Sequence, residues 1–247
     1  MVHLGALPGA PRYQGSLDEV IAAALRDATT LEAAGFDGLM VENFGDSPFF
    51  AEDVPKETVA AMTRAVGAVI DATGLPTGVN VLRNDAAAAL AVAAATGAGF
   101  IRVNVLSGTM FTDQGAITGR AAEVARTRAR LCPEVAIMAD VFVKHATPPH
   151  GWTLGNATRD LSERSGADAI VVSGPGTGAA TDPHDIEVVG QATELPLYVG
   201  SGADSATIAA LLQIATGAIV GSSLKVDGDP TNPVDLDRAM ALVTAAD

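Results

Sequence analysis

Residues 33–41 read AAGFDGLMV, and the same phrase returns as ATGAGFIRV at 95–103, RSGADAIVV at 164–172 and ATGAIVG at 215–221. In each copy a helical pattern ends, a glycine turns the chain, and a short run rich in Val, Ile or Leu begins. Glycine ends helices at such turns because it accepts the left-handed backbone conformation. Short, continuously apolar runs are typical of strands that helices cover on both faces. The recurring phrase therefore predicts a parallel α/β fold built from repeated strand–helix units.

Outward from these joints, the chain divides into strand-like runs and helical runs that alternate. Strands are expected at 2–7, 37–43, 76–82, 100–106, 135–142, 169–174, 196–201 and 218–223. Helices are expected at 16–34, 56–72, 85–96, 119–132, 156–165, 184–193, 204–215 and 234–245. Eight such units in 247 residues match a (β/α)₈ TIM barrel, so residues 1–247 are expected to form a single TIM-barrel domain. A doubly wound open sheet is the alternative that the pattern leaves open.

The charge balance limits the classes of partner. Lys and Arg number 15 against 29 Asp and Glu, so the formal net charge is −14. Such a surface repels polyphosphate backbones and anionic lipid, and nucleic-acid binding is therefore not expected. The acidic, lysine-poor composition is also compatible with an origin in a salt-loving organism.

Membrane spans and disulfides are not expected either. No apolar run approaches the ~18 residues that span a bilayer, so no integral membrane contact is predicted. The N-terminal MVHLGALPGAP carries no basic leader, and a cytoplasmic location is the expectation. The single cysteine, Cys132, excludes an intramolecular disulfide and a thiolate zinc cluster, and we expect it to be a small semi-buried filler. The alanine-rich helices leave a homo-oligomer open without indicating a face.

Side chains capable of chemistry fall at the carboxyl ends of the expected strands, where barrels of this class hold their active sites. They are His3, Glu42, Asn43, Asn80, Arg102, Asn104, Asp140, Lys144, His145, Ser173, Ser201 and Ser222. A polar side chain in an apolar strand costs about 1–3 kcal/mol if it stays unpaired, so convergence on one mouth favours a functional site. The residues expected to bind or orient substrate are His3, Asn43, Asn80, Arg102, Asn104 and Ser173.

The segment VENFGDSPF at 41–49 carries two carboxylates. Glu42 is a candidate general base or a ligand for a hard cation, and Asp46 offers a second carboxylate. The alternative is that Glu42 pairs with Arg102 on a nearby strand and that Asp46 forms an Asx turn. The sequence leaves both interpretations open.

The segment DVFVKHATP at 140–148 brings a carboxylate, an amine and an imidazole close together. Lys144 is a candidate for a Schiff base, an oxyanion donor or a phosphate ligand. His145 is a candidate proton shuttle near neutral pH, and Asp140 a candidate acid or base. As the alternative, Lys144 only neutralises Asp140 or Glu42. A divalent metal ion held by Glu42 and Asp140 is the cofactor that the pattern leaves open.

Two neighbouring strands end in small-residue turns, GSGADS at 200–205 and GSSLK at 221–225. Glycines let backbone N–H groups turn inward, and the loops after the seventh and eighth strands are the recurrent phosphate site of such barrels. The residues expected to bind phosphate are Gly200, Ser201, Gly202, Gly221, Ser222 and Ser223. Lys225 is expected either to add charge there or to point to solvent.

The loop SGPGTGAATD at 173–182 is rich in glycine. Its spacing does not match the Rossmann fingerprint, and no Gly-Lys-Ser/Thr makes it a Walker loop. We expect it to form a flexible lid or to offer further backbone amides at the mouth of the barrel.

The motifs taken together resemble one known family. The segments that carry the resemblance are, in order, VHLGALPGAPRY (2–13), DGLMVENFGDSPF (37–49), VNVL (79–82), IRVNVLSG (101–108), ADVFVKHA (139–146), VVSGPGTG (171–178), VGSGA (199–203) and GSSLK (221–225). Through them the chain resembles the BtpA/SgcQ family of TIM-barrel proteins. The resemblance implies the barrel and the site map. The family includes a photosystem I biogenesis protein and another member encoded with sugar-metabolism genes, so the resemblance implies no single reaction.

The site map favours an enzyme that acts on a small phosphorylated metabolite, such as a sugar phosphate or a nucleotide-derived phosphate. Acid–base chemistry would make it an isomerase, a lyase or aldolase, or a hydrolase. The residues expected to carry that chemistry are Glu42, Asp140, Lys144 and His145. Two alternatives stay open: a non-catalytic assembly factor that keeps an enzyme-like barrel, and a sensor that binds a phosphorylated metabolite without turnover.

Overall fold

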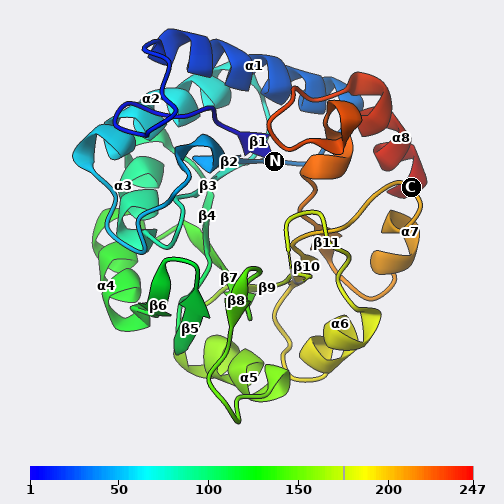
Figure 1. Cartoon of the computed structure of the whole chain (residues 1–247). Helices are drawn as coiled ribbons and strands as arrows, with labels where there is room; N and C mark the ends of the chain where they lie inside the picture. The colour runs from blue at the N-terminus through cyan, green and yellow to red at the C-terminus, as the bar shows by residue number, and fades with distance from the viewer. Residues whose placement is uncertain (175, 247) are drawn as a thin grey trace.

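The chain forms a barrel of parallel strands enclosed by helices, which Figure 1 shows along its axis. The computed structural model describes residues 1–174 and 176–246. Eight strands lie side by side in the order β1-β2-β3-β4-β7-β9-β10-β11, and each paired neighbour is parallel. Across the seam between the first and last strands, the amino group of Met1 donates a hydrogen bond to the carbonyl of Val220 at 2.8 Å. The predicted barrel is confirmed, and the open-sheet alternative is wrong.

The barrel strands agree with the sequence in number and order. They are β1 (Val2–His3), β2 (Leu39–Glu42), β3 (Thr77–Asn80), β4 (Phe100–Val103), β7 (Ala136–Val141), β9 (Ala169–Val172), β10 (Leu197–Val199) and β11 (Gly217–Ala218). Each is shorter than expected, because the residues that follow it leave the sheet and build the loops of the mouth.

Helices surround the strands, and most begin and end near the expected residues. They are α1 (Leu17–Ala34), α2 (Lys56–Ala72), α3 (Ala86–Thr96), α4 (Ala121–Leu131), α5 (Leu154–Arg164), α6 (Pro183–Gly190), α7 (Ile208–Leu211) and α8 (Leu236–Ala246). Three of the four joints behave as predicted, since Gly35, Gly97 and Gly166 are left-handed with φ of 95°, 80° and 75°. The fourth is wrong, because Gly217 lies within β11. Among the described residues, no helix is both long and apolar enough to cross a membrane.

The helix expected at 204–215 is wrong in extent, since α7 is a single turn. Oδ1 of Asp204 accepts hydrogen bonds from the amides of Ala206 and Thr207, both at 3.0 Å. These bonds hold the start of the segment in a side-chain-capped turn, which competes with a regular helix. This unit of the barrel therefore contributes turn amides to the mouth in place of a long helix.

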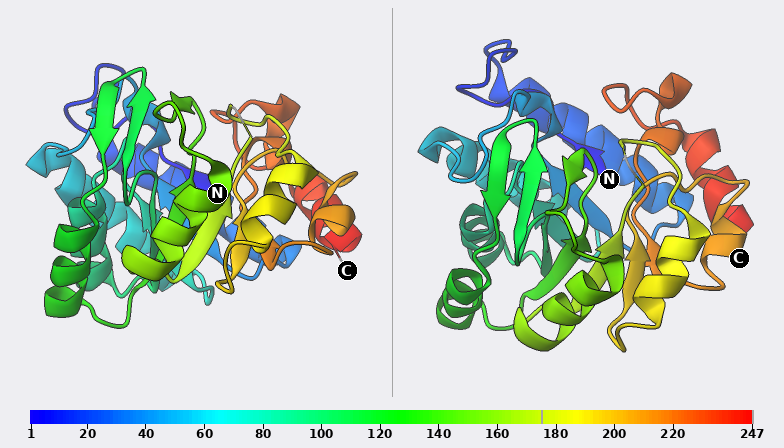
Figure 2. Two further views of the ribbon diagram at one scale, coloured as in Figure 1. Left: turned by 90° about the horizontal axis from the view of Figure 1, so that it is seen from below. Right: turned by 60° about the horizontal axis from the view of Figure 1, so that its bottom comes forward.

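A second, three-stranded antiparallel sheet stands over the mouth, and the sequence predicted no strands there. β5 (Thr109–Thr112) and β6 (Gly115–Thr118) form a hairpin, and β8 (Ala146–Thr147) pairs with β5. Figure 2 shows the hairpin standing beyond the end of the barrel. The residues Met110, Ile117, Val105 and Val143 form a small buried cluster beneath it. That cluster exists only once loops from two barrel strands meet, so local periodicity gives no sign of it.

The inside of the barrel is apolar at one end and polar at the other. The apolar end is packed by Met40, Met138, Ala169 and Val171. At the carboxyl ends of β2, β3, β4 and β7, the buried side chains are Glu42, Asn80, Arg102, Asn104 and Asp140. Because side chains alternate along a strand, Met40 and Glu42 point to the same side of the sheet. The polar set is therefore at the carboxyl ends of the strands, at the mouth.

Candidate active site

A buried ion pair lies at the centre of the mouth. Nη2 and Nε of Arg102 donate to the two carboxylate oxygens of Asp140 at 2.7 and 3.0 Å. Nδ2 of Asn104 donates to Asp140 at 2.9 Å, and the hydroxyl of Ser173 lies 3.4 Å from it. With both oxygens bonded, Asp140 joins the ends of neighbouring strands, and its predicted acid–base role stays a prediction. Arg102 and Ser173, predicted to bind substrate, are parts of the same network.

Glu42 is a buried carboxylate with one oxygen free for a ligand. It is 3% exposed, and its Oε2 accepts a hydrogen bond from Nδ2 of Asn80 at 2.6 Å. Burial alone would raise the pKa of Glu42, but His3 when protonated, the charges of Lys144 and Arg102, and the Asn80 hydrogen bond lower it overall. Glu42 is therefore an anion at neutral pH. The predicted alternative, in which it pairs with Arg102, is wrong because Arg102 pairs with Asp140.

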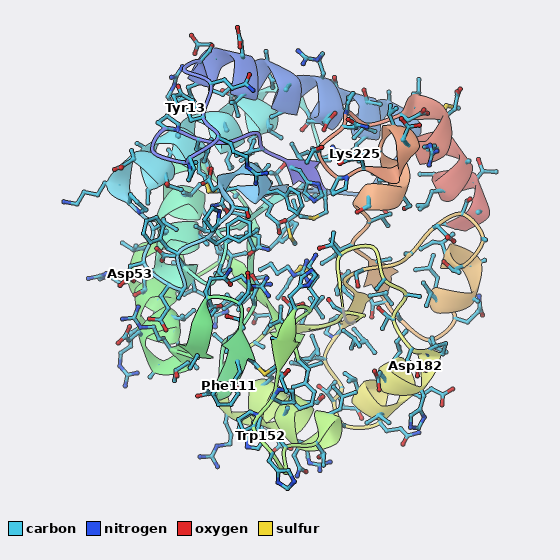
Figure 3. All side chains as sticks on the ribbon, in the orientation of Figure 1. Tyr13, Asp53, Phe111, Trp152, Asp182 and Lys225 are labelled. Carbon is cyan, nitrogen blue, oxygen red and sulfur yellow. The ribbon has the colours of Figure 1, made fainter. Side chains whose placement is uncertain are left out.

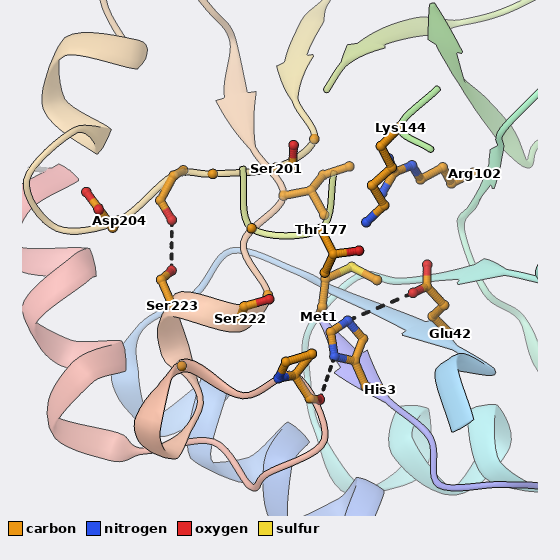
Figure 4. A pocket seen from close by; sticks show the side chains of 18 residues that line it. Met1, His3, Glu42, Arg102, Lys144, Thr177, Ser201, Asp204, Ser222 and Ser223 are labelled. Carbon is orange, nitrogen blue, oxygen red and sulfur yellow. Dashed lines mark hydrogen bonds and ion pairs between the residues drawn. The ribbon is translucent and has the colours of Figure 1, made fainter. Parts of the chain in front are cut away.

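His3 faces Glu42 from β1. Its Nδ1 lies 3.0 Å from the carbonyl oxygen of Pro230, so Nδ1 donates and Nε2 keeps a lone pair. Nε2 lies 3.9 Å from Oε1 of Glu42, and the ring stacks on Phe44 with centroids 4.5 Å apart. Burial lowers the pKa of His3 to about 4, so the imidazole is neutral at neutral pH. His3 therefore presents a hydrogen-bond acceptor to the cavity, and Figure 4 shows its ring beside Glu42.

Lys144 approaches from the segment that follows β7. Figure 4 shows its side chain reaching into the cavity from the same side as Glu42 and Arg102. No hydrogen bond or ion pair joins its amine to another described side chain. Burial lowers the pKa of Lys144, and the charge of Glu42 opposes that effect. The alternative that Lys144 only neutralises Asp140 or Glu42 has no direct ion pair to support it.

Two cavities meet at these side chains. One, of about 420 Å³, is bordered by the loops after β10 and β11. The other, of about 740 Å³, is bordered by the loops after β1, β2 and β3. The residues common to both are His3, Glu42, Lys144, Thr177 and Pro230. A ligand that occupies both cavities must therefore pass Glu42 and Lys144.

The predicted phosphate loops border the smaller cavity. All six residues line it: Gly200, Ser201, Gly202, Gly221, Ser222 and Ser223. Within the described chain, no backbone hydrogen bond is donated by the amides of Gly202, Ala203, Ser222 and Ser223. Figure 4 shows Ser222 and Ser223 across the cavity from Glu42. The loops therefore offer backbone donors opposite the candidate base.

The three serine hydroxyls of these loops are not equally free. Ser201 accepts from the amide of Gly174 at 2.9 Å and donates to the carbonyl of Ala179 at 3.2 Å. Ser223 donates to the carbonyl of Ala203 at 2.8 Å. Ser222 forms no such bond with another described residue, so its hydroxyl is the one available to a ligand.

The glycine-rich loop 173–182 borders the smaller cavity through Thr177 and Gly178, and Pro175 within it lies outside the described residues. Figure 4 shows Thr177 at the cavity. Nε2 of His145 accepts from the amide of Thr177 at 3.1 Å and lies 3.0 Å from its hydroxyl. A Cβ added at Gly202 would lie 2.3 Å from the carbonyl oxygen of Ala179, so the loop crosses directly over Gly202. His145 therefore holds the loop, while its predicted role as a proton shuttle stays a prediction.

Asn43 and Asp46 have structural partners. Oδ1 of Asn43 accepts from the amide of Leu82 at 2.7 Å, and its Nδ2 donates to Asp46 at 3.0 Å. Asp46 also accepts from the amide of Leu7 at 2.8 Å. Asn43 thus joins the loops after β2 and β3, which leaves its amide little capacity for the predicted contact with substrate.

Lys225 lies outside the mouth. Its side chain is 1% exposed, and its amine pairs with Asp27 of α1. Figure 3 shows it at the wall of the barrel near α1 and α8. Both predictions for Lys225, added charge at the phosphate loops and exposure to solvent, are wrong because a distant helix supplies its counter-charge.

Sequence reasoning missed two neighbours of the site. Arg83 follows β3, is 4% exposed and lines the larger cavity. Thr177 lines both cavities from the glycine-rich loop. A charged residue directly after the expected strand at 76–82 was a signal for Arg83, whereas nothing in the loop singled out Thr177.

The two candidate metal ligands do not fit a divalent ion. The described residues contain no group of three or more His, Cys, Asp or Glu side chains placed to hold a metal. Both oxygens of Asp140 accept hydrogen bonds from Arg102 or Asn104. Glu42 alone, with one oxygen bonded to Asn80, leaves too few donors.

Solved structures of other proteins share the barrel fold of this chain. Thiamine phosphate pyrophosphorylase from Pyrococcus furiosus matches with a TM-score of 0.58 at 12% identity, covering 93% of this chain and 90% of that chain. Tryptophan synthase from M. tuberculosis matches with a TM-score of 0.59 at 20% identity, covering 91% and 86%. At such identities the likeness shows the fold alone.

Relatives in sequence bear on the family. An uncharacterized protein of Thermococcus kodakarensis is 49% identical over 246 residues, which cover 100% of this chain and 93% of that protein. The photosystem I biogenesis protein BtpA of Synechocystis sp. is 46% identical over 246 residues, which cover 99% and 86%. The model of the BtpA family matches residues 1–247. The chain therefore belongs to the BtpA family.

Proposed function

We propose that this protein is an enzyme that converts a small phosphorylated metabolite by acid–base chemistry. The observation that carries the proposal is the position of Glu42 and Lys144, a buried carboxylate and an unpaired amine, where two cavities meet. Free backbone amides border one of those cavities. A phosphorylated substrate requires catalytic side chains placed next to a group of donors that binds its phosphate.

The phosphate would be bound by the amides of Gly202, Ala203, Ser222 and Ser223, with the hydroxyl of Ser222 as a further donor. Lys144 borders the same cavity and supplies positive charge. The carboxylate of Asp204 also borders it, but Oδ1 accepts three hydrogen bonds within its own turn. Backbone donors held in place bind phosphate without ordering long side chains.

Glu42 is the proposed general base. Its free Oε1 would take a proton from a carbon next to a carbonyl, while the amine of Lys144 donates a hydrogen bond to the carbonyl oxygen as negative charge develops there. Return of the proton to the neighbouring carbon completes an isomerisation. If Glu42 instead takes the proton of a hydroxyl on the β-carbon, the bond between the α and β carbons breaks to a carbonyl product and the same kind of enolate, which Lys144 stabilises, and the reaction is that of a lyase. A hydrolase is the third class that we keep for the site.

Two acceptors would orient the hydroxyl groups of the substrate. Nε2 of His3 carries a lone pair that faces the cavity. Oδ1 of Asn104 is buried without a hydrogen-bond partner in the described chain, and Asn104 lines the larger cavity. A buried acceptor without a partner costs free energy, so a substrate hydroxyl there would bind favourably.

The lowered pKa of Lys144 also supports an imine branch of the chemistry. In that branch the neutral amine attacks the substrate carbonyl, and water leaves. Borohydride added during turnover would then trap a covalent adduct on Lys144, visible by mass spectrometry of the peptide. Turnover without any adduct removes this branch and leaves Lys144 as a hydrogen-bond donor.

The test of the whole proposal is a thermal-shift screen with sugar phosphates and nucleotide-derived phosphates, followed by mass spectrometry of the products. We expect a stabilising compound that is converted, and loss of conversion in Glu42→Gln and Lys144→Met. Arg64→Met, a surface variant on α2, is the matched control and keeps full activity. If a compound stabilises the protein but is not converted, the protein is a sensor and the proposal of an enzyme is overturned.

A second candidate is a non-catalytic assembly factor, favoured by the 46% identity to the photosystem I biogenesis protein of Synechocystis sp.. It predicts that Glu42→Gln preserves the biological role in the host. It also predicts no stabilising phosphate compound in the screen. The net charge of −14 supports a small-molecule partner over a nucleic acid in either case. A cytoplasmic location and self-association stay predictions.

A further inference from the structure

Three cationic side chains are buried within the described chain: Lys225 at 1% exposure, Arg102 at 2% and Arg83 at 4%. Lys225 pairs with Asp27, and Arg102 pairs with Asp140. Among the described residues, no carboxylate oxygen lies within 4.0 Å of the guanidinium of Arg83. A buried charge without a directly paired carboxylate is costly, so the position of Arg83 calls for an explanation.

The position of Arg83 is held by its surroundings. Its amide donates to the carbonyl of Phe50 at 3.1 Å, and Nη2 donates to the carbonyl of Lys144 at 2.6 Å. A guanidinium carries five N–H donors, so this single side-chain bond leaves most of them unused. Burial lowers the pKa of Arg83, while the nearby charges of Asp140, Asp113 and Glu42 oppose that effect without forming an ion pair, and the arginine stays charged at neutral pH. The remaining donors therefore face the larger cavity that Arg83 lines.

The larger cavity combines this cation with apolar walls. Those walls are formed by Leu4, Phe44, Phe49 and Leu82. Two carboxylates also border the cavity, but Glu42 accepts from Asn80 and Asp113 from Gln114, and neither pairs with Arg83. A volume of about 740 Å³ is ample for a ring-sized molecule.

We infer that Arg83 forms an anion subsite in the larger cavity, and that its ligand is a carboxylate carried on an apolar, ring-sized body. The planar fork of arginine donates two parallel hydrogen bonds to a carboxylate, which gives both charge and orientation. The phenyl rings of Phe44 and Phe49 and the side chains of Leu4 and Leu82 cover the apolar body. The ligand supplies the directly paired carboxylate that the described residues do not provide.

The subsite also narrows the substrate class, and this step rests on the proposed function. Both cavities share Glu42 and Lys144, so a substrate with phosphate in the smaller one and carboxylate in the larger one brings its centre to these residues. Arg83 would then select substrates with two anionic ends over simple sugar phosphates. The carboxylate subsite itself does not depend on that phosphate assignment.

Titration calorimetry with benzoate and with benzamide, its neutral analogue of equal shape, tests the subsite directly. The wild type is expected to bind benzoate and to bind benzamide at least tenfold more weakly, about the factor that a charge-assisted hydrogen bond supplies. Arg83→Met should lose the same tenfold or more for benzoate, and Arg83→Lys should recover only part, because a lysine cannot form the fork. Arg64→Met, far from the cavity, should bind benzoate as the wild type does.

The location is checked with para-bromobenzoate soaked into crystals of the wild type, whose bromine signal should lie in the larger cavity. No binding of benzoate, equal binding of benzamide, or a bromine site elsewhere overturns the subsite, and none of these needs a folded Arg83 variant. Inorganic phosphate is titrated in parallel. If the wild type binds benzoate but not inorganic phosphate, the proposed function is contradicted and the subsite stands. If it binds phosphate but not benzoate, the subsite is contradicted and the proposed function stands.

Discussion

Arg102 lies on β4, between β3 with Asn80 and β7 with Asp140. Which carboxylate Arg102 pairs with determines which carboxylate at the mouth stays available for chemistry. Arg102 reaches Asp140 through two hydrogen bonds and leaves Glu42 to the amide of Asn80. An amide does not neutralise a carboxylate, so Glu42 keeps its charge for a ligand. One pairing thus separates a structural carboxylate from the candidate base.

His3 makes stability depend on pH. Burial lowers its pKa from 6.5 to about 4, so between these values the unfolded chain binds a proton that the folded chain does not. The neutral, buried His3 therefore leaves the free energy of unfolding undiminished above pH 6.5. As pH falls from 6.5 toward 4, the free energy of unfolding falls by on the order of 3 kcal/mol. Urea unfolding of wild type and His3→Gln at pH 7 and pH 4.5 measures it. We expect a smaller loss of unfolding free energy in the variant, and equal losses would refute this assignment.

At the scale of elements, the glycine-rich loops are built around close backbone approach. Gly202 has φ of 75°, and a Cβ there would lie 2.3 Å from the carbonyl oxygen of Ala179. Gly97 has φ of 80°, yet a Cβ there would meet no atom within 4 Å. The two glycines therefore separate the cost of the left-handed conformation from the cost of the loop contact.

We expect Gly97→Ala to lower the free energy of unfolding by about 1–2 kcal/mol, the cost of the left-handed conformation alone. Gly202→Ala should cost more, because it also displaces the loop that crosses it, and should weaken binding of inorganic phosphate. Chemical denaturation and calorimetry measure the two effects. Equal stability losses and unchanged phosphate binding would argue against a loop packed on Gly202.

The link between His145 and Thr177 predicts a pH-dependent loop. Nε2 accepts from the amide of Thr177, so a proton on that nitrogen removes the acceptor. Burial and the charges of Arg83 and Lys144 lower the pKa of His145, and Asp113 opposes them. The loop should therefore be held at pH 7.5. It should be released only at a pH below about 6.5, the ordinary pKa of histidine, because the pKa of His145 is lowered.

Hydrogen exchange at residues 176–182, corrected for intrinsic rates, follows this release. Protection should fall between pH 7.5 and pH 5 in the wild type. His145→Phe should show the low protection at both values. If the variant protects the loop as well as the wild type does, His145 does not hold it.

At the scale of the whole molecule, an ion pair joins the first helix to the last part of the chain. Lys225 pairs with Asp27, whose other oxygen accepts from the amide of Val234 at 2.8 Å. Loss of one partner of a buried pair typically costs about 3–5 kcal/mol, so Lys225→Met should be strongly destabilising. Asp27→Asn combined with Lys225→Met should cost less than the sum of the single changes in guanidinium unfolding. A Lys225→Met variant as stable as the wild type would show that the barrel closes without the pair.

Local signals carried most of the fold. The glycine joints end α1 and α3 as predicted, and Ser16 caps α1 by accepting from the amide of Glu19 at 3.2 Å. Such contacts join residues close in sequence, so the sequence reveals them. The hairpin of β5 and β6 was missed because its buried side chains pack on loops from other strands.

The sequence by itself determined the repeated strand–helix units, their order, and most of the polar residues at the barrel mouth, though not Arg83 or Thr177. Only the tertiary structure decided the partners: Asp140 for Arg102, Asp27 for Lys225, and, among the described residues, no ion-paired carboxylate for Arg83. The physical reason is that periodicity sets which way a side chain points along its own strand. Whether it meets a counter-charge depends on the register and spacing of strands and loops far away in the chain, and those are settled only when the barrel closes.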